Sequence, residues 1–496
     1  MGVALLAGLY LASIGPYWNI SPDSATYVEW GRSLASGKGW ERAPPLPPVT
    51  AVLYAGVLYF FPDGYVALNA FTQLLILTSM GLVFGLLARR DDPVRALLVI
   101  LLSLASTSLH YASTQLLSEP TFMLVSLAAL VLLERSGTLA ECLAGVLLVI
   151  AAMTRTIGLV LAVAVLLVEA HAAVARRREP RPVLIAFALL AFLGVVLWDL
   201  YAAHGSYLAV QLRTLLVGDP WSPDPSAPSV TRLLDGIRDN VRMLPAAGGI
   251  LLNARSPETG WPGILARVSG TVLLAVGLHR ALRERVSVTP VYVLLYVAVV
   301  SVRMLAGDEH ENRFLVPVIP FVFHYALDGA RHRAAFLERG ALRSWWVPSL
   351  RVAGALYVIW FLGVGMTQMM GGVRNAHSSP FGSYPIKRPG NYDAQRIALW
   401  VKDHTRPQDR YASAQSSMFD VLTERRGFDI VPGRTLSPDA FLPWLEERQV
   451  RYLFVDHTLR EVRDPLLVVI RSHPRRFQPV LLLPRASLYE VRPPGE

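Results

Sequence analysis

Four charged side chains in this sequence stand where long apolar runs begin or end, and together they could do chemistry. Asp23 follows the first apolar run, and Glu119 precedes a later one in "SEPTFMLVSLAALVLLER". Arg155 stands in "AAMTRTIGLVLAV" and Arg313 in "DEHENRFLVPVIPFVF". Each alone has a structural explanation, because acids complement helix starts and arginines reach toward lipid headgroups. Four on one side of a membrane would instead form a site, since carboxylates accept protons and guanidinium groups bind anions.

The composition is that of a membrane protein. The 496 residues are 53% hydrophobic and 17% charged, which exceeds the apolar fraction of an ordinary soluble domain. The net charge of +10 lies in short clusters between apolar runs, so it favours membrane topology over nucleic-acid binding. A single cysteine, Cys142, excludes an intrachain disulfide and a cysteine-built metal site.

The apolar runs predict a mainly α-helical polytopic protein with about eleven membrane-spanning helices, because about 20 helical residues cross the hydrocarbon layer. The predicted spans are 1–18, 66–88, 94–110, 120–134, 139–153, 156–174, 183–202, 263–280, 288–305, 313–328 and 351–371. The run 49–61 is too short to cross and follows "APPLPP", so we expect an interfacial helix there.

Basic clusters predict which side of the membrane each loop occupies. "RRDDPVR", "ARRREPRP", "HRALRER" and "RHRAAFLERGALR" all fall on one side, which is cytoplasmic by the positive-inside bias. The N-terminus is then inside, and the loops 19–65 and 203–262 are outside. The four charged residues of the candidate site share that outer side.

Two domains are expected: a transmembrane module over 1–371 and an extracytoplasmic α/β domain over 372–496. Within the second, the pattern predicts helices over 393–404 and 437–449 and strands over 410–414 and 450–456, followed by a strand pair over 477–483 and 487–492.

The segment "NISPDSATYVEWGRSLASGKGW" predicts a short helix directly after the first span. Ser21 can cap it, Pro22 can occupy its first position, and Gly37 and Gly39 mark its end. Asp23 then lies in the first turn, at the membrane surface.

These motifs resemble those of the GT-C superfamily of glycosyltransferases, the polytopic class that includes protein mannosyltransferases and lipid A aminoarabinose transferases. The matching segments are "PDSATYVEWGRSLASGKGW", Ser118 to Phe122, Thr154 to Gly158 and Arg313 to Phe321. The chain departs from the class where Ser24 replaces a second acid and where "APPLPP" lacks a basic residue.

The resemblance implies an inverting transferase that moves a sugar from a polyprenyl phosphate to a lipid, glycan or protein acceptor, on the outer face of a bacterial inner membrane. Asp23 is then the candidate base, and Glu119 the second catalytic candidate, which would orient the base or the acceptor. The candidates for the donor phosphate are Arg155, Arg313 and Arg303, and those for the sugar are Tyr27, Trp30 and Trp40.

A divalent metal is an open alternative, since Asp308 and Glu309 stand beside His310 and Glu311. Four consecutive residues cannot all face one ion on a regular helix, so a solvated acidic turn is the simpler interpretation and no cofactor is required.

Two other functions remain open. An O-antigen ligase-like enzyme would use the arginines of the loop 203–262, although the C-terminal domain argues against it. A lipid-linked glycan transporter or flippase would carry charges near the middle of its spans, whereas here they cluster at the outer ends.

The predicted topology can be tested directly. A reporter that is active only in the cytoplasm, fused after Glu496, should stay silent in cells, because the C-terminal domain is expected outside. Reporter activity would place Asp23 and Arg313 on the wrong side for an outer-face reaction.

Overall fold

The computed structural model describes most of the chain, and every statement below concerns that part. The described residues are 1–16, 21–39, 46–62, 64–90, 92–176, 179–202, 249–251, 253, 261–303, 311–337, 343–378, 389–414, 416–430, 438–457 and 460–493.

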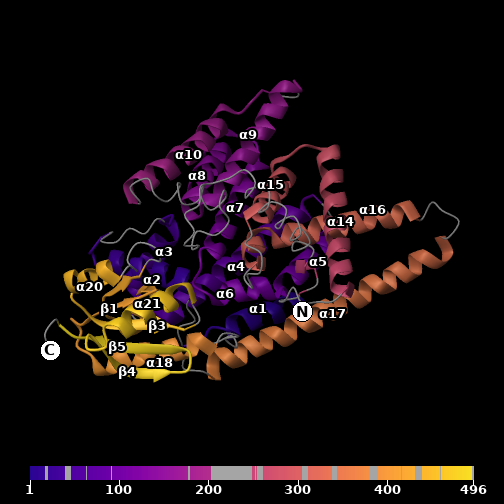
Figure 1. Ribbon diagram of the computed structural model, residues 1–496. Coiled ribbons are helices and arrows are strands. Elements are labelled where there is room, and N and C mark those ends of the chain that lie inside the picture. The colour runs from indigo at the N-terminus through magenta and orange to yellow at the C-terminus, as the bar shows by residue number, and fades with distance from the viewer. Residues whose placement is uncertain are drawn as a thin grey trace.

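Helices form the larger part of the molecule (Figure 1). In chain order they are α1 (Gly2–Ala12), α2 (Pro22–Ala35), α3 (Val49–Phe60), α4 (Tyr65–Ala88), α5 (Pro93–Leu104), α6 (Thr107–Thr114), α7 (Glu119–Leu133), α8 (Thr138–Thr154), α9 (Leu159–Val174), α10 (Pro182–Ala202), α14 (Trp261–Glu284), α15 (Val288–Arg303), α16 (Ile319–Leu337) and α17 (Arg343–Ser378). Two 3-10 helices, η1 (Thr156–Gly158) and η2 (Glu311–Val318), precede α9 and α16.

The predicted membrane character is confirmed, but the number of spans is not. Four helical segments are long and apolar enough to cross a bilayer, at 65–88, 156–174, 182–202 and 351–374, and a bent pair raises the number to five. The other apolar helices are shorter, as in α1, which covers 11 residues of the predicted span 1–18. Eleven spans therefore stays a prediction.

The predicted span 94–110 is broken in the structure. Helices α5 and α6 meet at an angle of 59°. The amide of Asn253 fills the break: its Nδ2 donates to the Ala105 carbonyl (3.0 Å), and its Oδ1 accepts from the Thr107 backbone N–H (2.8 Å). A buried side chain from a distant loop thus satisfies backbone groups that the break would otherwise leave unpaired.

Helix α2 forms as its sequence predicts. Ser21 is the N-cap, Pro22 is the first helical residue, and Ser21 and Ser24 exchange hydrogen bonds in a capping box. Gly37 and Gly39 follow the helix with φ of +74° and +68°, a conformation that favours glycine. Asp23 is thereby held in the first turn.

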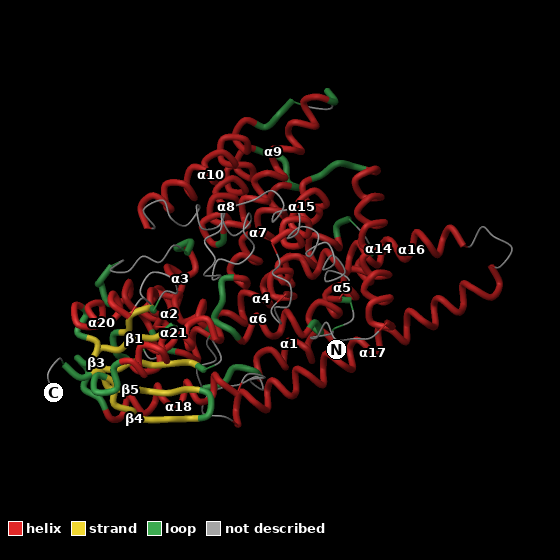
Figure 2. Tube along the Cα trace, viewed as in Figure 1, coloured by secondary structure: helices red, strands yellow, loops and turns green. Residues whose placement is uncertain are grey.

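The C-terminal domain is a small α/β unit at one end of the molecule (Figures 1 and 2). Its five strands are β1 (Arg410–Ser413), β2 (Gly427–Asp429), β3 (Val450–Asp456), β4 (Phe477–Leu483) and β5 (Ala486–Val491), and its helices are α18 (Pro389–His404), α19 (Ser416–Thr423), α20 (Pro438–Glu447) and α21 (Arg460–Ser472). The sheet order is β2-β1-β3-β5-β4. Strand β1 pairs in parallel with β2 and β3, whereas β5 pairs antiparallel with β3 and β4.

The predicted α/β character of this domain and its closing strand pair are confirmed, whereas α19, β2 and α21 were not predicted. The boundary at residue 372 falls inside α17, which is 36 residues long and reaches the domain (Figure 1).

Helices α2 and α3 lie between the C-terminal domain and the other helices (Figure 1). Tyr27, Trp30 and Tyr54 share one apolar cluster with Phe419 and Phe454 of that domain. Arg32 of α2 also donates from Nη1 to the carbonyl of Val421 in α19, at 3.3 Å. The helix that carries Asp23 is therefore packed against the C-terminal domain.

Two glycines let α14 and α16 cross in close contact. A Cβ at Gly277 would overlap the carbonyl oxygen of Tyr325, and one at Gly329 would overlap that of Leu273. Small residues at such crossings allow the two backbones to approach closely.

Gly277→Ala should therefore destabilise the protein. The added methyl meets backbone, which cannot move aside, so we expect a loss of about 1–3 kcal/mol in thermal unfolding in detergent. Gly85→Ala in α4 is the matched control: nothing lies within 4 Å of its Cβ, and alanine favours helix by up to about 1 kcal/mol. Equal effects at both positions would contradict this packing.

Candidate functional site

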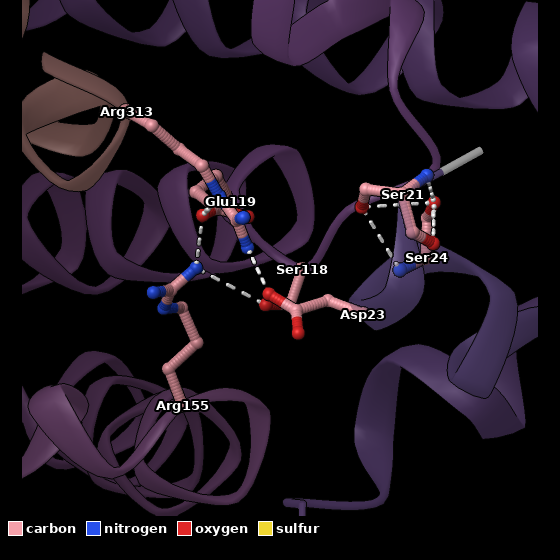
Figure 3. A network of polar contacts seen from close by, with 7 residues as sticks. All are labelled: Ser21, Asp23, Ser24, Ser118, Glu119, Arg155 and Arg313. Atoms are coloured by element: carbon pink, nitrogen blue, oxygen red, sulfur yellow. Dashed lines mark hydrogen bonds and ion pairs between the residues drawn. The ribbon is translucent and has the colours of Figure 1, made fainter. Parts of the chain in front are cut away.

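Asp23 lies at the exposed end of a network of charged side chains (Figure 3). Its Oδ2 accepts a hydrogen bond from Arg313 Nη2 at 2.7 Å. The Asp23 side chain is 53% exposed, whereas that of Arg313 is 13% exposed. The carboxylate is therefore open to an approaching molecule, whereas the arginine is largely buried.

Glu119 holds the network together from its buried end. Its side chain is fully buried, and its Oε1 accepts from Arg313 Nε at 2.5 Å and from Arg155 Nη1 at 2.6 Å. A carboxylate shared by two guanidinium groups is stabilised in its charged form. Glu119 Oε2 is buried and has no hydrogen-bond partner among the described residues.

Local structure explains why these side chains meet. Glu119 is the first residue of α7, where its charge complements the helix dipole, and Pro120 follows in a position suited to proline. Arg155 is the extended residue between α8 and η1, with φ −152° and ψ 135°. Arg313 lies in η2. A helix start, an interhelical turn and a 3-10 segment thus converge at one point.

Two further residues belong to the site and were not predicted. Ser118 is the N-cap of α7, but its hydroxyl accepts from Arg155 Nη1 at 3.2 Å and does not cap the helix. Phe314 presents its ring to both arginines, with the Cζ of Arg155 and of Arg313 each 5.6 Å from the ring centre. Both residues adjoin a predicted site residue and lie in segments that resemble the GT-C class, but neither signal indicates a contact with the arginines.

The network alternates in charge from Asp23 through Arg313 and Glu119 to Arg155 (Figure 3). Its two carboxylates balance its two guanidinium groups, so each largely buried charge has a partner. The four residues that the sequence singled out are therefore brought together, although their chemical roles stay predictions.

The predicted sugar contacts at Tyr27 and Trp30 lie deeper. Both side chains are 4% exposed. Burial raises the pKa of Tyr27 well above its ordinary value, so its phenol is neutral, and Ser118 is its side-chain hydrogen-bond partner. Neither ring is presented at the surface of the network, and their contact with a sugar stays a prediction.

The remaining candidates are not tested by the structure. Trp40, Asp308 and Glu309 lie outside the described residues, and Arg303 is described only in its backbone as the last residue of α15. Within the described ranges, no group of three or more His, Cys, Asp or Glu side chains could hold a metal ion.

Solved structures of other proteins share the fold of this chain. No family model matches the chain, and no curated protein matches its sequence. ArnT from Cupriavidus metallidurans bound to undecaprenyl phosphate matches with a TM-score of 0.58 at 13% identity, covering 99% of this chain and 97% of ArnT.

The oligosaccharyltransferase of Archaeoglobus fulgidus matches as well. Its structure tethered with an acceptor peptide has a TM-score of 0.57 at 12% identity, covering 99% of this chain and 74% of that one. Its complex with an inhibitory peptide and a dolichol-phosphate has a TM-score of 0.56 at 12% identity, covering 96% and 72%. The chain shares the fold of these proteins, which confirms the GT-C resemblance at the level of the fold.

Glu119→Gln should destabilise the protein strongly. The neutral amide keeps the shape but leaves Arg155 without its carboxylate partner and Arg313 with only the half-exposed Asp23. Breaking a buried pair in this way costs about 3–5 kcal/mol. Glu284→Gln is the matched control, because its pair with Arg280 is exposed (63% for Glu284) and should contribute below about 1 kcal/mol. Thermal unfolding in detergent measures both. Similar small losses would mean that Glu119 does not hold the site together.

Proposed function

We propose that this protein is a membrane glycosyltransferase that moves a sugar from a polyprenyl-phosphate donor to an acceptor, with inversion at the anomeric carbon. The observation that carries the proposal is the network in which Glu119 aligns Arg155 and Arg313 beside the half-exposed carboxylate of Asp23. The site thus combines cations for a leaving phosphate with a base for an acceptor hydroxyl.

Arg155 and Arg313 are the proposed binding site for the donor phosphate. As the bond to the sugar breaks, the phosphate gains negative charge, which fixed guanidinium groups stabilise more in the transition state than in the ground state. An arginine can also hold two phosphate oxygens at once. Two of the proteins with this fold were solved with undecaprenyl phosphate and dolichol-phosphate bound, which supports a lipid phosphate here.

Asp23 is the proposed base. The acceptor oxygen forms a bond to the anomeric carbon while the bond from that carbon to the phosphate oxygen breaks; the phosphate keeps the electron pair, and the acceptor proton passes to Asp23. Glu119 is fully buried, so no acceptor can reach it. We therefore assign Glu119 a positioning role, acting through the two arginines.

The location of the reaction follows from the charge pattern of the loops. The loops that carry the basic clusters are expected in the cytoplasm, on the side opposite to the network. The network and the C-terminal domain over 372–496 would therefore face outward from a bacterial inner membrane. The phosphate of a polyprenyl-phosphate sugar in the outer leaflet would then lie on the same side of the membrane as the arginines.

Release of polyprenyl phosphate tests the proposal. The full-length protein in liposomes should release it from a polyprenyl-phosphate sugar when an envelope lipid and glycan extract is added. A transporter or flippase would move the intact lipid without releasing phosphate. Absence of release with every donor sugar tested would contradict the proposal.

Asp23→Asn should lower turnover in this assay about 10²- to 10⁴-fold, the usual contribution of a general base. Asparagine is tolerated at a helix start, so folding should change little. Glu29→Gln, on the same helix but outside the network, is the control and should be mild. Normal turnover by Asp23→Asn would remove Asp23 as the base.

A further inference from the structure

The ion pair between Asp23 and Arg313 conflicts with the geometry that the proposed reaction needs. In an inverting displacement, the base and the leaving group act on opposite faces of the sugar. The carboxyl groups of inverting glycosidases, for comparison, stand roughly 6.5–9.5 Å apart. In the structure, however, Asp23 Oδ2 lies 2.7 Å from Arg313 Nη2, one of the atoms proposed to bind the leaving phosphate.

A phosphate and the Asp23 carboxylate would therefore compete for Arg313. Both are oxygen anions that accept charge-assisted hydrogen bonds from a guanidinium group. A carboxylate bound at Nη2 occupies a donor that a phosphate could use, and its charge repels a second anion nearby. Binding of one therefore weakens binding of the other.

Burial indicates which side of the pair moves. Arg313 is held from behind by Glu119, at 2.5 Å from its Nε, and its guanidinium faces the ring of Phe314. Asp23 is half exposed, and it belongs to the short helix α2. Rotation of the Asp23 side chain to another staggered rotamer would carry the carboxylate away while the arginine stays in place.

We propose that the Asp23–Arg313 ion pair is a substrate-sensitive latch: the donor phosphate takes over Arg313 and frees Asp23, so the base becomes available only when the donor is bound. The latch rests on the proposed function and adds an order to it, in which the lipid phosphate must bind before the acceptor proton can be removed. It would keep the Asp23 carboxylate hydrogen-bonded to Arg313 until a donor is in place.

The latch makes an unusual prediction, that removing the base strengthens binding of the lipid phosphate. Undecaprenyl phosphate, which carries no sugar and cannot react, is the probe, titrated into the full-length protein in detergent. Asp23→Asn should bind it about two- to five-fold more tightly than the unmodified protein, the range expected for removing a partly exposed ion pair that competes with it. Asp23→Ala should behave in the same way, which guards against a new hydrogen bond from the asparagine amide.

A double-mutant cycle isolates the competition. Arg313→Ala should weaken binding of undecaprenyl phosphate by itself, and in that background Asp23→Asn should give less than half of its former gain, because the contested guanidinium is absent. Glu29→Gln is the control on the same helix and should bind as the unmodified protein does. Size-exclusion profiles of all variants verify folding.

The outcomes separate the latch from the function. Tighter binding by both Asp23 variants, lost in the Arg313→Ala background, supports the latch. Unchanged or weaker binding by both, when the unmodified protein binds undecaprenyl phosphate, overturns the latch and leaves the transferase proposal intact. No binding by the unmodified protein overturns both.

Discussion

A single buried carboxylate holds the site together. Glu119 is fully buried, and its Oε1 receives hydrogen bonds from both Arg155 and Arg313. An unpaired charge in that position would be costly, so the three segments that supply these residues must meet in one arrangement. The network also reaches Asp23 and so joins the first turn of helix α2 to the same point.

The C-terminal domain takes part in this arrangement through α2. Helix α2 supplies Asp23 to the network. On the same helix, Arg32 donates a hydrogen bond to the domain, and Trp30 belongs to the apolar cluster that α2 shares with it. The C-terminal domain is therefore joined to the proposed site by packing, and a movement of the domain would shift α2 and with it Asp23. Elsewhere in the molecule, helices α14 and α16 pack in close backbone contact at Gly277.

The sequence was most informative where chemistry and local rules agree. Asp23, Glu119, Arg155 and Arg313 could be selected because all four fell on one predicted side of the membrane, although each alone has a structural explanation. Helix α2 could be predicted because Ser21 and Pro22 are local start signals. The prediction of α2 needs only the near neighbours of each residue, whereas the selection of the four charges also needs the topology inferred from basic clusters along the chain.

Features that depend on distant contacts could not be predicted. The break between α5 and α6 is stabilised by Asn253, which is 146 residues from Thr107, and no local pattern indicates that pairing. Phe314 and Ser118 look like an ordinary apolar residue and an ordinary helix cap until the arginines are placed around them. The short strand β2 is three residues long, too short for a periodic signal.

The central claim is that Arg155 and Arg313 form the site for a lipid phosphate beside Asp23. A cryo-electron microscopy map of the full-length protein with undecaprenyl phosphate tests it most directly. The account predicts phosphate density within hydrogen-bond distance of both guanidinium groups, with the Asp23 carboxylate turned away from Arg313. Phosphate density elsewhere on the protein, with the network of Glu119 unchanged, would contradict it.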